Sequence, residues 1–298
     1  MATLAKADAP TAFAVTPLTP TIGAEIDGVD LRDDLPQATI DAIYQALLRH
    51  KVIFFRDQNI THEEHIAFAR RFGDLEIHPT TPADQPNPEI FHLKPVQWSA
   101  DAEAQRKASG KKRHSGADLW HSDVTWREAP SLGSILRGRI IPECGGDTLW
   151  SDQVAAYEGL SPSMKEWVCT LTAIHDGSVF AKAAAERGKT FAGEIPEVEH
   201  PVVRTHPDTG ERALYVNCAF TRRIVGLSEE ESDWLLAHLY AQAAIPDYQV
   251  RFRWRENSIA FWDNRACQHY AVADYAPAMR HMERVTIVGD RPYFDPAR

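Results

Sequence analysis

Hydrophobic positions follow a helical period in a few segments of this chain. A stripe with three- and four-residue steps predicts an amphipathic helix over about 36–49. Thr61 with Glu64, and Ser228 with Glu231, have the spacing of capping boxes, so a helix is expected to begin after each. The stripe of the first helix consists of Ile40, Ile43, Leu47 and Leu48.

Most other patterned segments are short and have the length or alternation of strands. The apolar run KVIFFRD at 51–57 predicts a strand that is buried on both faces. Segments 249–255 and 258–263 flank a polar turn at 256–257 and are expected to run out and back. Further strands are expected at 134–142, 147–152, 202–206 and 212–217, the last two as a hairpin.

Many short strands with a few helices outside them predict an all-β core with flanking helices. A double-stranded β-helix (jelly roll) and a two-sheet sandwich both fit this pattern. We expect a flexible N-terminal tail at 1–15 and a single domain at 16–298. The polar, weakly patterned stretch at about 95–118 is expected to be a lid-like insert in that domain.

Composition narrows the class of protein. The net charge of −10 over 298 residues argues against a nucleic-acid partner. No apolar run reaches the roughly 18 residues of a membrane span, and the N-terminus lacks the apolar core of a signal peptide. Four scattered cysteines without a CxxC pair suit reduced thiols, so a cytoplasmic location is expected.

Two histidines and one aspartate form a candidate metal-binding set. His121 and Asp123 are two residues apart, so on a strand both would point to the same face. With the distant His269 they match the 2-His-1-carboxylate ligand set, which leaves coordination positions open on Fe(II). Taken alone, the pair also fits a strand-end histidine that is hydrogen-bonded to a neighbouring carboxylate.

Two arginines near the C-terminus are candidates for binding anions. On an extended strand Arg280 and Arg284 share a face with Met282 and Thr286. Buried guanidinium groups need anions, and a planar guanidinium can hold a carboxylate or sulfonate with two parallel hydrogen bonds. The alternative is a solvated edge strand with ordinary surface arginines.

Taken together, these motifs resemble those of a known family. HSDVTW at 121–126, GGDTLW at 145–150 and WDNRACQHYAVADY at 262–275 precede Arg280 and Arg284. This series is similar to the taurine dioxygenase family of Fe(II)/2-oxoglutarate-dependent oxygenases. The resemblance extends over most of the chain and implies a jelly roll whose strand ends hold the metal.

The resemblance also implies roles for individual residues. Fe(II) would be held by His121, Asp123 and His269, with 2-oxoglutarate and O2 as co-substrates. Thr148 and Arg280 would bind the far carboxylate of 2-oxoglutarate. The pocket for the prime substrate would be formed by His78 and Arg284, which bind its anionic group, and by the apolar Val124 and Phe220. Trp262 is expected close to the iron.

A small anionic organic substrate is therefore expected. The implied reaction hydroxylates the carbon next to the anionic group of a taurine-like sulfonate and releases an aldehyde and sulfite, with succinate and CO2. Thr81 and Ala117 depart from the taurine pattern, so alkyl sulfates and aryloxy or alkyl carboxylic acids stay open as alternatives. A metal-binding sensor is the non-enzymatic alternative, and a homo-oligomer (dimer or tetramer) is expected.

Overall fold

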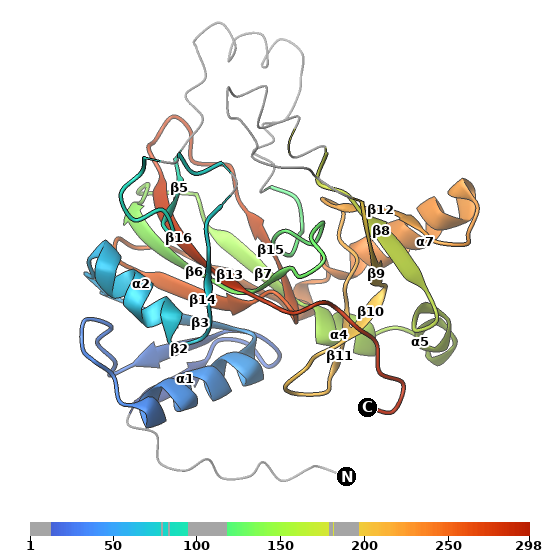
Figure 1. Ribbon diagram of the computed structural model, residues 1–298, viewed down its shortest axis with the longest axis horizontal. Helices are drawn as coiled ribbons and strands as arrows, with labels where there is room; N and C mark the ends of the chain where they lie inside the picture. Colours follow the sequence, from blue (N-terminus) through green and yellow to red (C-terminus); the bar gives the residue numbers. More distant parts are fainter. Residues whose placement is uncertain (1–12, 79, 83, 95–117, 179–180, 182–196) are drawn as a thin grey trace, which may run out of the picture.

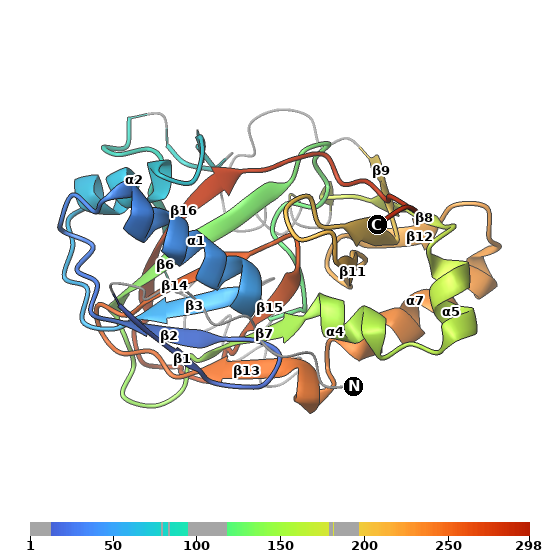
Figure 2. The same cartoon turned by 90° about the horizontal axis from the view of Figure 1, so that it is seen from below.

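Two β-sheets that pack face to face form the centre of the molecule (Figure 1). The computed structural model describes residues 13–78, 80–82, 84–94, 118–178, 181 and 197–298. Within them, helices lie along the outer side of the larger sheet, and smaller sheets with further helices lie at its other end (Figure 2). Most of the expected tail and insert falls outside the described residues, although Ala14–Pro17 already forms a strand.

The larger sheet has eight strands among the described residues. Their order is β1 (Ala14–Pro17), β2 (Ala24–Asp27), β3 (Val52–Phe55), β14 (Ile259–Asp263), β6 (Ser131–Ile140), β16 (His281–Val288) and β4 (Leu75–Glu76), with β5 (Phe91–Leu93) also paired to β16. The second sheet has the order β13 (Gln249–Phe252), β7 (Thr148–Asp152) and β15 (Cys267–Ala271).

Alternation along the strands separates two hydrophobic cores. Ile53 and Phe55 of β3 face outward and pack with the helices, whereas Val52 and Phe54 face the second sheet. All four are fully buried, which confirms the prediction of a strand that is buried on both faces. The ring of Phe54 stacks on Phe252 of β13 at a centroid distance of 4.0 Å, so aromatic contacts join the two sheets.

Helices α1 (Gln37–His50) and α2 (His62–Arg70) cover the outer face of the larger sheet. Thr61 caps α2 in a complete capping box with Glu64, as predicted. Ser228 and Glu231 do the same for α7 (Glu229–Gln242).

A separate core lies at the far end of the second sheet. It joins α7 and the short helices α4 (Gln153–Glu158) and α5 (Pro162–Val168) to two small sheets. These sheets are formed by β12 (Thr221–Ile224), β8 (Thr172–His175) and β9 (Val198–Pro201), and by the hairpin of β10 (Val203–Thr205) and β11 (Arg212–Leu214), which confirms the predicted hairpin. A short 3-10 helix, η1 (Pro246–Tyr248), precedes β13.

One expectation about strand pairing is wrong. Segments 249–255 and 258–263 do not form a hairpin, because β13 pairs with β7 while β14 pairs with β3 and β6. The turn between them docks on β6 instead, where the Asn257 amide donates to the Gly138 carbonyl at 2.8 Å. The chain therefore crosses from one sheet to the other at this turn.

Among the described residues, no helix combines the length and hydropathy that a membrane crossing requires.

Candidate metal centre

The two histidines and the aspartate of the candidate metal set lie together at one end of the space between the sheets. Their ligand atoms all lie within 4.8 Å of one another, and all three residues are buried. His269 lies on β15, and its Nε2 is 3.9 Å from Oδ1 of Asp123. The rings of His121 and His269 have centroids 4.1 Å apart. The predicted convergence of these three side chains is confirmed.

The reason for that convergence differs from the one expected. His121 forms only an isolated antiparallel bridge with His269, with amide-to-carbonyl distances of 3.1 and 2.8 Å. Asp123 lies in the turn that follows, and Val124 there has a positive φ of 49°. The Asp123 amide donates to Oδ1 of Asn264 at 3.2 Å. A bridge and a tight turn, rather than strand alternation, aim the two side chains at one point.

Hydrogen bonds and burial prepare these groups as metal ligands. Nδ1–H of His121 donates to the Leu119 carbonyl at 2.6 Å, which leaves Nε2 as the lone-pair donor. Burial lowers the pKa of His121 and that of His269, so both imidazoles are neutral. Burial alone would raise the pKa of Asp123, but the positive charge of Arg284 and the hydrogen bond from the Ser134 hydroxyl lower it, so the group is a carboxylate.

This donor set fits a divalent transition metal. Two neutral imidazoles and one carboxylate are the ligands of the 2-His-1-carboxylate sites that hold non-haem Fe(II). The second carboxylate oxygen of Asp123 accepts a hydrogen bond from the Ser134 hydroxyl at 3.0 Å, which fixes the carboxylate plane.

Asn264 links the metal-binding turn to the core, a role that sequence patterns did not reveal. Its Oδ1 accepts from the Asp123 amide and also from Nε1 of Trp262, at 2.9 Å. Its Nδ2 donates to the Ser131 hydroxyl at 3.0 Å. Trp262 is 1% exposed and packs against the His269 ring at 4.9 Å between centroids, which confirms its expected proximity to the centre.

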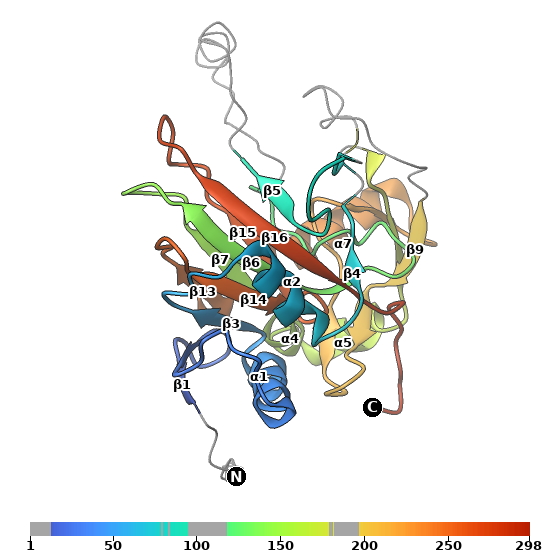
Figure 3. The same ribbon diagram turned by 60° about the vertical axis from the view of Figure 1, so that its left-hand side comes forward.

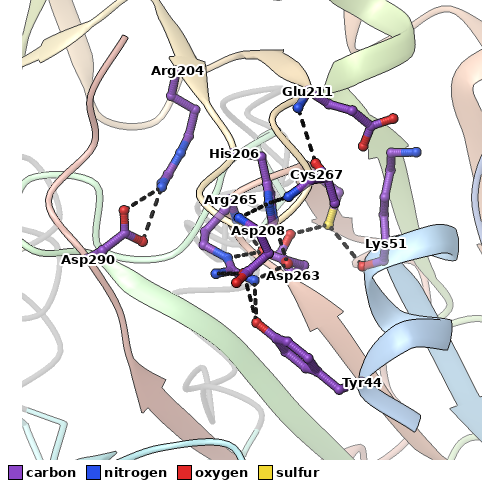
Figure 4. Close-up of polar contacts among 11 residues, drawn as sticks. Tyr44, Lys51, Arg204, His206, Asp208, Glu211, Asp263, Arg265, Cys267 and Asp290 are labelled. Atoms are coloured by element: carbon purple, nitrogen blue, oxygen red, sulfur yellow. Dashed lines mark hydrogen bonds and ion pairs between the residues drawn. The ribbon is translucent and has the colours of Figure 1, made fainter. Parts of the chain in front are cut away.

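A buried ion network holds the β14–β15 turn from the other side (Figure 4). Asp263 accepts from Nε and Nη2 of Arg265 at 2.9 and 2.7 Å, and from Nε2 of His206 at 3.0 Å. Arg265 also reaches Asp208 at 2.7 Å and the Tyr44 hydroxyl at 3.0 Å. The network anchors the turn that leads into His269.

Thr148 and Arg280 come together, and β7, which carries Thr148, pairs with β15, which carries His269. Nη2 of Arg280 lies 3.4 Å from the Thr148 hydroxyl, and its Nε donates to the Gly146 carbonyl at 2.9 Å. The Thr148 oxygen also accepts from Nε1 of Trp254 at 2.9 Å, so its own hydrogen stays available for donation. Arg280 is 8% exposed, and its hydrogen bonds go to no carboxylate of the described residues. A buried cation and a hydroxyl donor thus lie side by side.

Arg284 lies between the metal set and an aromatic wall. Its Nη1 is 2.7 Å from Oδ1 of Asp123, while its buried Nε has no hydrogen-bond partner in the described part of the chain. Its guanidinium lies over the Phe91 ring at 5.5 Å, and the His78 ring stacks on Phe91 at 3.9 Å between centroids. His78 and Arg284 therefore both contact Phe91.

The apolar residues of the candidate pocket also converge. Val124, Trp126 and Phe220 form one small buried cluster. The Phe220 ring meets the His121 ring edge-on at 6.0 Å between centroids. Of the two departures from the taurine pattern, Thr81 has a buried hydroxyl without a hydrogen-bond partner among described residues, and Ala117 lies outside them.

Comparison with known proteins agrees with this geometry. The profile of the "Taurine catabolism dioxygenase TauD, TfdA family" matches residues 14–286. An alpha-ketoglutarate-dependent sulfate ester dioxygenase from Pseudomonas putida is 40% identical over 98% of this chain and 95% of its own length. An alkylsulfatase from Acinetobacter baylyi is 38% identical over 92% and 84%. The crystal structure of a taurine dioxygenase from Burkholderia xenovorans has a TM-score of 0.81 at 38% identity, over 96% of this chain and 93% of that one. The chain therefore belongs to the TauD/TfdA family of 2-oxoglutarate-dependent dioxygenases.

Proposed function

We propose that this 2-oxoglutarate-dependent dioxygenase hydroxylates the carbon next to the anionic sulfur group of a small alkyl sulfate ester or sulfonate. The observation that carries the proposal is a metal-type ligand set with two separate buried arginines beside it. One guanidinium suits the co-substrate and the other suits the prime substrate, because each can hold an oxyanion with parallel hydrogen bonds.

Three residues would hold the metal and two would hold the co-substrate. His121, Asp123 and His269 would bind Fe(II) through two imidazole nitrogens and one carboxylate oxygen. Arg280 and Thr148 would bind the far carboxylate of 2-oxoglutarate, the first as a cation and the second as a hydroxyl donor. When bound, iron and 2-oxoglutarate supply the oxidation of a C–H bond by O2, coupled to decarboxylation of the co-substrate to succinate.

The remaining residues would bind and orient the prime substrate. The unpaired Nε of Arg284 and the imidazole of His78 would hold its anionic oxygens, and Phe91 keeps the guanidinium plane in place. Val124 and Phe220 would exclude water from the side next to His121. This arrangement would point the carbon next to the anionic group at the metal ligands. These residues would therefore contribute to the reaction by positioning the substrate.

The sulfur group decides the second product. A hydroxylated sulfate ester, R–CH(OH)–OSO3⁻, collapses to an aldehyde and hydrogen sulfate, whereas a hydroxylated sulfonate gives an aldehyde and sulfite. We favour the sulfate ester, because the relatives at 40% and 38% identity are named as a sulfate ester dioxygenase and an alkylsulfatase. The departure at Thr81 agrees with a substrate other than taurine.

We also propose that the fold is a jelly roll in a single domain. The mainly β architecture resembles that of a taurine dioxygenase, and the two facing sheets fit a jelly roll that forms a single domain over 16–298. The homo-oligomer stays a prediction. Light scattering tests it by measuring the molar mass of the protein in solution.

A paired substrate panel tests the proposed function. Purified protein with Fe(II), 2-oxoglutarate and O2 is offered n-alkyl sulfates and the n-alkylsulfonates of matching chain length. We expect sulfate esters to stimulate succinate release most and to yield inorganic sulfate with the aldehyde. Taurine and uncharged alkyl ethers should stimulate little. If no sulfate ester or sulfonate raises succinate release above the level without prime substrate, the proposal is wrong.

A further inference from the structure

A second cluster of metal-ligating side chains lies on the outer side of β16, away from the site described above. In the β5–β16 ladder Glu283 is directly opposite His92, and the next residue, Arg284, is opposite Phe91. Neighbouring residues of a strand point to opposite faces, so Glu283 and His92 point away from the Arg284–Phe91 pair. Figure 3 shows β5 alongside β16 and α2 across it, and both elements contact β16.

Three of these side chains are close enough to share one ion. Ligand atoms of His92, His281 and Glu283 all lie within 4.8 Å of one another. Nδ1 of His92 is 3.1 Å from Nε2 of His281 and 3.8 Å from Oε1 of Glu283. Ligands about 2.0–2.2 Å from a tetrahedral ion are about 3.4 Å apart, so the observed separations bracket that value.

The cluster has the surroundings of a ligand set rather than of surface residues. The Glu283 side chain is 4% exposed, and Nε2 of His62 donates to its Oε1 at 2.9 Å. Its other oxygen, Oε2, is buried without a hydrogen bond from any described residue, and the nearest cation is Nε of Arg139 at 3.6 Å. A buried carboxylate oxygen with one long ion pair and no hydrogen bond is costly, and a bound cation would offset that cost.

The imidazoles are in the state that metal binding requires. Burial lowers the pKa of His92 and that of His281, although Glu283 opposes the shift in both cases. Neutral rings can offer a lone pair to a metal. Both histidines are half-buried, so an ion could enter from solvent.

From this geometry we propose that Nδ1 of His92, Nε2 of His281 and the carboxylate of Glu283 bind a divalent transition metal such as Zn(II), separately from the family's iron site. His62 holds the carboxylate in place from α2, as outer hydrogen-bond partners of metal ligands do. The ion replaces the direct contact between His92 and His281. It ties β5 to β16 directly behind Phe91 and Arg284 and thereby stiffens the wall of the substrate pocket. The site is structural, because its ligands face away from that pocket.

Stoichiometry of Zn(II) in ligand variants tests the site independently of activity. The experiment uses the full-length protein with Asp123→Ala, which removes one ligand of the His121–Asp123–His269 set. The protein is loaded with Zn(II), and weakly bound ions are removed by gel filtration. We expect about one tightly held Zn(II) per chain by elemental analysis, and a rise in Tm on loading. His92→Ala and Glu283→Gln, each added singly to Asp123→Ala, should lose that ion and the Tm rise.

His238→Ala is the matched control, because His238 is an exposed histidine on α7, far from the cluster in sequence, and its loss should leave the ion in place. Circular dichroism confirms that each variant is folded, and having two ligand variants keeps the test valid if one of them is not. The proposal is overturned if Asp123→Ala protein holds no Zn(II), or if its Zn(II) survives both ligand substitutions.

Discussion

At the scale of single residues, the sequence indicated which side chains come together, but it did not indicate the contacts that support them. The order of the motifs, with Arg280 behind them, indicated roles for His121, Asp123, His269, Thr148 and Arg280. The structure brings the two histidines together with Asp123, and Thr148 together with Arg280. The side chains that fix them were not predictable, since a contact such as that from Ser134 to Asp123 comes from a residue outside the motifs. Such contacts depend on register and turn geometry, which residue spacing does not specify.

Replacing Arg280 by alanine should weaken 2-oxoglutarate binding. The change removes a charge-assisted pair worth about 1.5–3 kcal/mol, so the KM for 2-oxoglutarate should rise by roughly ten- to a hundredfold or more. Thr148→Val removes one neutral donor and should raise this KM less. Initial rates of succinate formation at varied 2-oxoglutarate measure both effects. An unchanged KM in Arg280→Ala would mean that the co-substrate carboxylate binds elsewhere.

Replacing Arg284 by alanine should act on the other anion. The KM for an alkyl sulfate should rise by roughly ten- to a hundredfold, for the same loss of a charge-assisted pair. Arg284→Lys should recover part of that loss, because an ammonium lacks the planar fork of donors. Binding of 2-oxoglutarate to Fe(II)-loaded protein, followed anaerobically by calorimetry, should change far less. Equal losses for both ligands would contradict two separate anion positions.

At the scale of elements, local signals predicted the elements better than their partners. Capping boxes and apolar periodicity predicted α1, α2 and α7, because these signals lie within each helix. The predicted pairing of β13 with β14 was wrong. The tight turn between them suggested a hairpin, but β13 pairs with β7 instead. The turn that carries Asp123 was likewise expected to be a strand, and its geometry depends on Asn264 from a distant segment.

Asn264→Ala should destabilise the fold and weaken the metal site together. The substitution leaves the Asp123 amide and the Trp262 indole without their shared acceptor. Each buried donor that loses its partner costs about 1–3 kcal/mol of stability. The free energy of unfolding in urea should therefore fall by about 2–6 kcal/mol. Fe(II) affinity should fall by roughly ten- to a hundredfold, the usual effect of losing an outer partner. Ser131→Ala, which removes only the contact to Nδ2 of Asn264, is the milder control.

The buried His65 of α2 should make the stability of the fold depend on pH. Burial lowers the pKa of His65 from 6.5 to about 4, with its Nε2 held at the Ile135 carbonyl. Because the folded pKa lies below the unfolded one, this histidine destabilises the fold as pH falls from about 6.5 to about 4, by about 3 kcal/mol in total. His65→Phe should flatten the urea-derived stability profile over this range. A slope identical to that of the wild type would contradict the assignment.

At the scale of the whole molecule, the mainly β class and the family were predictable from the sequence. The arrangement of the two sheets and the helices in layers was not, because it depends on which face of each strand points inward. Residues of β3 alternate between the outer core under the helices and the inner core between the sheets, and apolar residues on both sides do not reveal which side is which. Joining the two sheets brings His121 beside His269 and Arg284 beside Asp123. The metal centre is therefore a property of the assembled sheets.

Coupled turnover tests this account most directly. With Fe(II), 2-oxoglutarate, O2 and an n-alkyl sulfate, we expect aldehyde, sulfate and succinate in nearly equal molar amounts, measured by chromatography. Asp123→Ala protein, checked by circular dichroism to be folded, should form none of the three above background. If that variant forms the products at the rate of the wild type, or if succinate appears equally without any sulfate ester or sulfonate, the account is contradicted.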